Sequence, residues 1–111
     1  MNWDKLIERV NQFYLDEDEG IKIPFSNDAF DRPVEPPHLM YTEIDTDNFG
    51  ADNIVYFEKM NSRLELTTNI KDKDLEKRIE NEILFDTFWN KTITYIPSEK
   101  VWNVSYFFEM I

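Results

Sequence analysis

The stretch that most constrains the fold is residues 48–70, which reads NFGADNIVYFEKMNSRLELTTNI. The β-branched and aromatic run at 54–57 predicts a strand, and residues 59–62 predict a tight turn after it. A second strand is expected at 63–70, where residues alternate between two faces: Leu64, Leu66, Thr68 and Ile70 on one, and Arg63, Glu65, Thr67 and Asn69 on the other. Period-two alternation is typical of a strand with one face in solvent. The stretch therefore predicts a hairpin in a sheet that is covered on one side only.

Two helices are expected to cover this sheet. Residues 3–14 and residues 73–85 each place their apolar side chains on one helical stripe. Asn2 and Asp72 precede these segments and are the expected N-caps, because their side-chain oxygens can accept from the first amides of a helix.

Further strands are expected at 38–46, 92–96 and 101–110. In the last of them one face is expected to hold Trp102, Val104, Tyr106, Phe108 and Met110. The resulting order, α-β-β-β-α-β-β, predicts an α+β fold with a mostly antiparallel sheet and the helices packed on one face. A chain of 111 residues makes one domain, residues 1–111.

Residues 21–37 form a long connection with four of the five prolines. It also holds apolar residues that favour burial, and long ordered loops are often functional. Two interpretations stay open here. The connection is either an irregular lid over the core or an arm that contacts a neighbouring subunit.

No catalytic, cofactor or metal site is expected. The chain has no cysteine and one histidine, His38, which leaves no thiolate and little imidazole for zinc. Residues 45–50 partly match a calcium loop, but Phe49 and Tyr56 stand where the fifth and twelfth positions require oxygen ligands. Residues 47–53 are therefore interpreted as a turn. With only two glycines there is no phosphate-binding loop, and we expect a protein that is not an enzyme.

The net charge is −11, from 12 basic and 23 acidic residues. It is spread along the chain, with −5 on residues 1–36 and −6 on residues 37–111. Without a basic patch, binding to DNA or to an anionic membrane is not expected. On the second helix, Glu76 and Glu80 are expected to be an exposed like-charged pair one turn apart. The acidic surface of the whole chain would suit the lining of a channel through which DNA slides without binding.

Aromatic residues make up 15% of the chain and crowd its C-terminal part. These residues are Phe85, Phe88, Trp89, Tyr95, Trp102, Tyr106, Phe107 and Phe108. They serve either the core alone or both the core and contacts with other copies of the chain.

Several segments resemble one family of proteins. They are the Pro-Pro pair before the first strand, NFGADN ahead of VYF, the strand LELTT, the helix DLEKRIE and the segment TYIPSEKVWNVSY. Together they are similar to small phage and prophage proteins of the tail-terminator and tail-completion group, from long-tailed phages of low-GC Gram-positive bacteria. The likeness covers roughly residues 1–111 and is firmest from Pro36 onward.

The resemblance implies a structural protein of the virion, assembled in the cytoplasm of the bacterial host. Such α+β subunits form a ring, commonly a hexamer, that closes the tail tube and meets the head connector. The partners implied are further copies, the tail-tube protein and head-connector proteins, while DNA passes through unbound. Candidate interaction residues are Asn48, Phe49, Asp52, Arg63, Glu65 and Thr67. Alternatives are another head–tail joining or head-closure protein, or an acidic module that binds a basic protein.

Overall fold

The computed structural model describes residues 1–51 and 54–111, with side chains described outside residues 47–58. The elements follow one another as α1 (Trp3–Asn11), β1 (Tyr14–Asp16), β2 (Ile21–Lys22), β3 (Phe25–Asn27), β4 (His38–Ala51), β5 (Ile54–Thr68), α2 (Lys73–Glu82), β6 (Trp89–Ile96) and β7 (Val101–Met110). Within these described residues, neither helix is long and apolar enough to cross a bilayer.

The main sheet has five strands in the order β3-β4-β5-β7-β6. Only the β3–β4 pairing is parallel, and β1 and β2 form a separate antiparallel pair. The predicted α+β class and the mostly antiparallel sheet are therefore confirmed. The three short strands between α1 and β4 were not predicted, because each has only two or three residues and shows no alternation.

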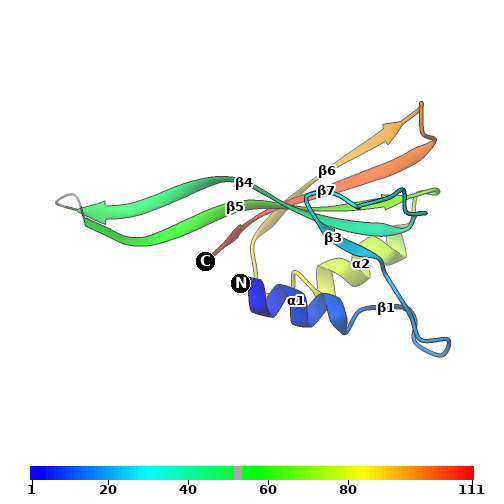
Figure 1. The fold of residues 1–111 in the computed structure, drawn as a ribbon, viewed down its shortest axis with the longest axis horizontal. Coiled ribbons are helices and arrows are strands. Elements are labelled where there is room, and N and C mark those ends of the chain that lie inside the picture. Colours follow the sequence, from blue (N-terminus) through cyan, green and yellow to red (C-terminus); the bar gives the residue numbers. More distant parts are fainter. Residues whose placement is uncertain (52–53) are drawn as a thin grey trace.

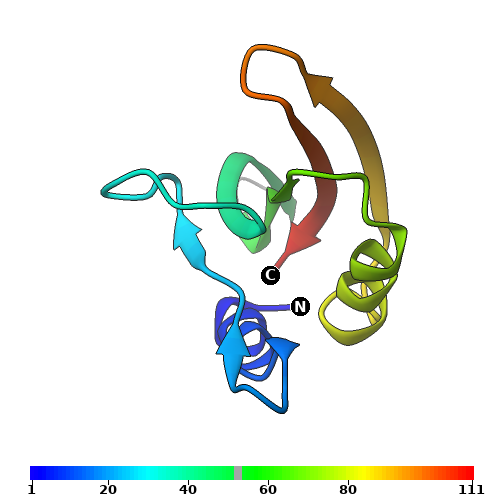
Figure 2. The same ribbon diagram turned by 90° about the vertical axis from the view of Figure 1, so that its right-hand side faces the viewer.

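Both helices lie against the same face of the curved sheet (Figures 1 and 2). The core between the layers contains buried residues from both helices and from β4, β5 and β7: Leu6, Val10, Leu75, Ile79, Leu39, Tyr41, Leu64, Leu66, Val104, Tyr106, Phe108 and Met110. The alternation predicted for the last strand is confirmed from Val104 onward. Ile70, predicted to share the core face of the hairpin, is exposed because β5 ends at Thr68.

Both predicted helix caps are present. The side chain of Asn2 accepts from the Lys5 amide at 2.9 Å, and that of Asp72 accepts from the Leu75 amide at 3.0 Å. The helices end three residues earlier than predicted. The apolar pattern continues past each end because Phe13 and Ile83 are still buried in the core although neither is helical.

The predicted turn at residues 59–62 is wrong. These residues lie inside β5, where Asn61 is opposite Asp45 and Ser62 is opposite Glu43 in β4. Local pairing explains why this polar run can be extended: Asn61 donates to Asp45, and the buried Ser62 hydroxyl lies 2.8 Å from that of Tyr41. The runs 54–57 and 63–68 are therefore one strand instead of two.

Residues 47–51 belong to β4, so this part of the turn predicted at 47–53 is wrong, and residues 52–53 lie outside the described residues. β7 ends at Met110, which is opposite Met60 in β5. Beyond that point β4 and β5 continue as a two-stranded ribbon, here called the arm, which comprises residues 47–51 and 54–59. The arm projects from the body along the longest dimension of the molecule, 52 Å (Figure 1).

The proline-rich connection lies on the sheet. Ile23 is buried in the core, and the ring of Phe30 contacts the ring of His38 edge to face at a centroid distance of 5.0 Å. Phe30, Pro33 and His38 line a hollow of about 530 Å³ with Thr67. Within the predicted connection 21–37, Ile23 thus reaches the core, while the part around Phe30 and Pro33 lies at one end of the face that carries no helix. The choice between a lid and an arm that contacts a neighbouring subunit stays open.

Candidate interaction site

The outer edge of β6 is the clearest candidate site. Each residue from Trp89 to Ile96 is paired with β7 on one side. On the other side, no strand among the described residues pairs with it, because β6 is the last strand of the sheet. An unpaired edge offers a row of N–H and C=O groups to any further strand.

The surface along this edge is rich in apolar and β-branched residues. Ile93 and Tyr95 are 43% and 44% exposed, and the ring of Tyr95 lies 5.1 Å from that of Trp102 across the hairpin. Thr92 and Thr94 are exposed on the opposite face of the strand. The tip of the β6–β7 hairpin extends past the end of the helical layer (Figure 1).

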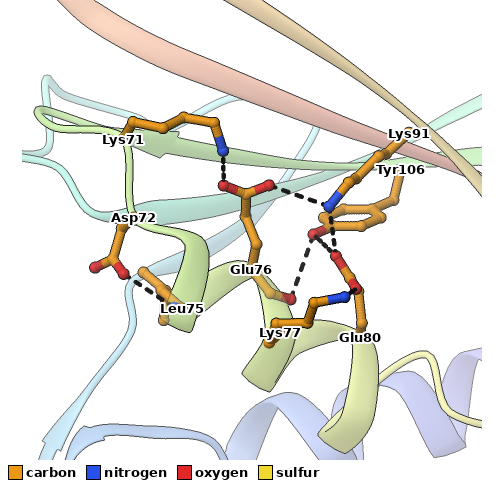
Figure 3. Close-up of polar contacts among 8 residues, drawn as sticks. All are labelled: Lys71, Asp72, Leu75, Glu76, Lys77, Glu80, Lys91 and Tyr106. Carbon is orange, nitrogen blue, oxygen red and sulfur yellow. Dashed lines mark hydrogen bonds and ion pairs between the residues drawn. The ribbon is translucent and has the colours of Figure 1, made fainter.

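Lys91 is the one charged residue of β6, and its side chain is turned away from the edge toward α2 (Figure 3). Its Nζ lies 2.8 Å from Oε2 of Glu80 and 3.2 Å from Oε1 of Glu76. The hydroxyl of Tyr106 in β7 donates to the same Oε2 of Glu80 at 2.8 Å. A lysine commonly protects a strand edge from unwanted pairing, whereas here it binds the helix instead.

Further cations complete this group, which we call the lysine–glutamate cluster: Lys71, Glu76, Lys77, Glu80, Lys91 and Tyr106 (Figure 3). Lys71 pairs with Glu76, and Lys77 lies 3.5 Å from Glu80. The two glutamates are only 3% and 5% exposed. Buried carboxylates require such partners, since an uncompensated buried charge is costly.

Within the cluster, Glu80 and Lys91 form an ionised pair at neutral pH. Burial raises the pKa of Glu80, but hydrogen bonds from Lys91 and Tyr106 outweigh it, so that pKa lies below its usual value. Burial lowers the pKa of Lys91, yet its bonds to Glu80 and Glu76 raise that pKa overall. Burial and the neighbouring Glu80 raise the pKa of Tyr106, so its hydroxyl remains a donor. The cluster therefore connects α2 to the edge strand by charge-assisted hydrogen bonds.

The expected exposure of Glu76 and Glu80 is therefore wrong. The spacing along α2 shows that both glutamates lie next to the buried residues Leu75 and Ile79. It gives no sign of the cation that β6 places against them. The missed signal lies in β6, where Lys91 is on the same face of the strand as Trp89 and Ile93. In β7, Tyr106 lies opposite Lys91 and Phe108 lies opposite Trp89, so this is the face that packs against the helices. A lysine in that position needs an acidic partner in the opposing layer.

A second open edge lies on the opposite side of the sheet. β3 pairs only with Leu39, Met40 and Tyr41 of β4. From residue 42 onward, the outer side of β4 has no partner strand among the residues with a described backbone. Glu43 and Asp45 are exposed along this edge. The sheet thus carries one acidic edge and one edge without carboxylates.

Of the residues predicted from the hairpin, three lie on the face without helices. Arg63 Nε is 3.4 Å from Oε2 of Glu65, and Asn103 donates to the same carboxylate. Thr67 is buried beside the hollow under the proline-rich connection. These side chains form a polar patch on the sheet, and a contact role for Arg63, Glu65 and Thr67 stays a prediction.

Of the other three predicted residues, two belong to the arm and one lies outside the described residues. Asn48 and Phe49 belong to β4 by their backbone, but their side chains lie outside the described part, and Asp52 lies outside the described residues altogether. The arm and β6 belong to opposite edges of the sheet, so the hairpin alone did not indicate β6 as a site.

The chemistry that this geometry offers is backbone pairing with another strand. No family model matches the chain, and no curated protein matches its sequence. In the described part of the chain, no group of three or more histidine or acidic side chains could hold a metal ion. The candidate site therefore consists of the two open edges and the lysine–glutamate cluster behind β6.

Proposed function

We propose that the protein is a virion structural protein of a phage or prophage that self-assembles into a ring at the head–tail junction. There it completes the tail, contacts the tail tube and the head connector, and has no enzymatic role. The support for phage origin is the resemblance of segments such as LELTT and TYIPSEKVWNVSY to tail-terminator proteins.

The observation that carries the assembly part is the presence of two open edges on opposite sides of one sheet. β6 presents eight consecutive residues that pair with no second strand in the described part of the chain, and its one charged side chain is bound to α2. Proteins that stay monomeric usually protect such edges with charges, prolines or covering segments. An edge left open in this way favours pairing between subunits.

The charge of −11 fits the same role. A DNA-filled channel requires walls that do not bind phosphate, and a wall of carboxylates repels the DNA backbone. We propose that the ring turns an acidic surface toward its lumen, so that DNA passes without specific binding.

The proposal is tested with purified protein and tail tubes from the same phage. Electron microscopy of the mixture should show rings at one end of each tube, and tubes capped in this way should no longer elongate. A protein that never joins a tube end, at any ratio of the two components, contradicts the proposed function.

A further inference from the structure

We infer that the subunits join head to tail, with the β6 edge of one copy pairing with the β4 edge of a second copy of this chain, from residue 42 onward. This inference rests on the proposed function and specifies which surfaces form the subunit contact. The sheet would then continue from copy to copy.

The first argument is the position of the two edges. β6 and β4 lie at opposite sides of the ordered strands β4-β5-β7-β6, so one subunit can use both edges at once. The described side chains Thr42 and Thr94 lie on the same face, because Thr42 is opposite Arg63 and Thr94 is opposite Asn103. A head-to-tail contact repeats and closes into a ring when its rotation allows.

The second argument is charge. Among the described side chains of the open β4 edge, residues 42–46, Glu43 and Asp45 are exposed carboxylates and none is basic. Two such segments would repel each other in a symmetric β4–β4 contact. β6 carries no carboxylate, so an acidic β4 edge is repelled less by β6 than by a second β4 edge.

The third argument is the need of the arm for a partner. Beyond the pair Met60–Met110 the arm has two strands only, and a two-stranded ribbon is marginally stable in water. A neighbouring β6 would add a third strand to it. A symmetric β6–β6 contact would leave the arm without this support.

Paired substitutions at one site test the charge argument. Thr94→Glu puts a carboxylate opposite the acidic β4 edge and should weaken association at least about tenfold. Thr94→Lys has a side chain of comparable length and should leave association unchanged or strengthen it. Equal weakening by both variants contradicts the inference. It would indicate a symmetric β6–β6 contact, in which either charge faces a like charge on the other copy.

Cross-linking tests the pairing itself, and the absence of native cysteines makes it specific. Thr94→Cys and Thr42→Cys proteins, distinguished by tags of different size, are mixed and treated with a short bis-maleimide. The expected product is the mixed dimer, while Lys77→Cys on α2 should give none with Thr42→Cys. A product formed only between two Thr94→Cys chains overturns the inference.

The outcomes also separate this inference from the proposed function. Rings on tail tubes without the mixed product contradict the head-to-tail contact and leave the function standing. Open filaments that give the mixed product but never cap a tube support the head-to-tail contact. They contradict the proposed function. A monomer under all conditions contradicts both.

Discussion

Lys91 joins the edge strand β6 to the helix behind it. Its ammonium group lies between two carboxylates that are almost fully buried, and it connects the edge strand to α2. Its pKa is raised, so on the alkaline side this stabilisation persists up to the ordinary value of 10.5 and is lost as pH rises through the higher folded value.

Replacing this lysine is therefore expected to be costly. Lys91→Met leaves Glu76 with Lys71 alone and takes from Glu80 its closest cation. The free energy of unfolding, measured by urea denaturation at neutral pH, should fall by about 3 kcal/mol. The control Lys77→Met removes a lysine whose side chain is 72% exposed and should cost less than about 1 kcal/mol. Equal losses would show that the cluster does not depend on Lys91.

A second ion pair predicts a pH dependence. The two terminal guanidinium nitrogens of Arg9 each donate to one oxygen of Asp86 at 2.8 Å, and these bonds lower the pKa of Asp86 from 3.8 to about 2. A lowered folded pKa contributes stability above the ordinary value, and that contribution disappears as pH falls from 3.8 to about 2. Because the Asp86 side chain is 40% exposed, solvent screening limits the contribution to about 1 kcal/mol.

The comparison of wild type with Asp86→Asn isolates this effect. At pH 6 the wild type should be more stable by about 1 kcal/mol in urea denaturation, and the difference should vanish near pH 2. Asp31→Asn, in the exposed proline-rich connection, should show no such convergence. A difference that persists at pH 2 would assign the stabilisation to packing of the side chain instead of its charge.

Residue-scale prediction from sequence succeeded where the cause is local. The caps Asn2 and Asp72 act on amides three residues away, so their chemistry is visible in the sequence itself. The partners of Glu80 come from β6 and β7, 11 and 26 residues away. No periodicity within α2 contains that information.

At the scale of elements, the hairpin of β4 and β5 shows how tertiary context overrides turn propensity. Residues 59–62 have polar character and lack strict alternation, which favoured a turn. They are extended because they pair with β4, and Met60 to Ser62 also pair with β7 on the other side. Of the strand predicted at 63–70, residues 63–68 are confirmed because their inward residues meet the core, whereas Ile70 lies beyond the end of β5.

The edge strand provides an element-scale prediction. In a single subunit every second amide of β6 points away from β7 and exchanges readily with solvent. On assembly these amides should exchange at least about tenfold more slowly, as measured by hydrogen exchange of dilute and concentrated samples. The amides of the β1–β2 pair serve as the control and should not change. Unchanged β6 amides in an assembled sample would contradict pairing at this edge.

For the whole molecule, charge sets the conditions of association. Copies with a net charge of −11 repel one another, and salt shortens the range of that repulsion from about 30 Å at 0.01 M to about 3 Å at 1 M. Association should therefore strengthen as sodium chloride rises from 0.02 to about 0.5 M. The Thr94→Lys variant should show a weaker salt dependence, because its added cation already offsets part of the repulsion. Dissociation of the wild type by salt would contradict this account.

The α+β class was predictable because it follows from two amphipathic helices and several alternating strands, which are local patterns in the sequence. The open edges were not, since strand order depends on pairings between segments far apart in sequence. The phage role derives from resemblance alone and stays a prediction.

The most direct test of self-assembly through the open edges is the mass of the particle in solution. Multi-angle light scattering of the wild-type protein, alone and with tail-tube protein, should give a closed oligomer, with six copies expected from the resemblance. Thr94→Glu should shift that mass toward the monomer. A wild-type protein that remains monomeric in both samples, or an oligomer unaffected by Thr94→Glu, would contradict the account.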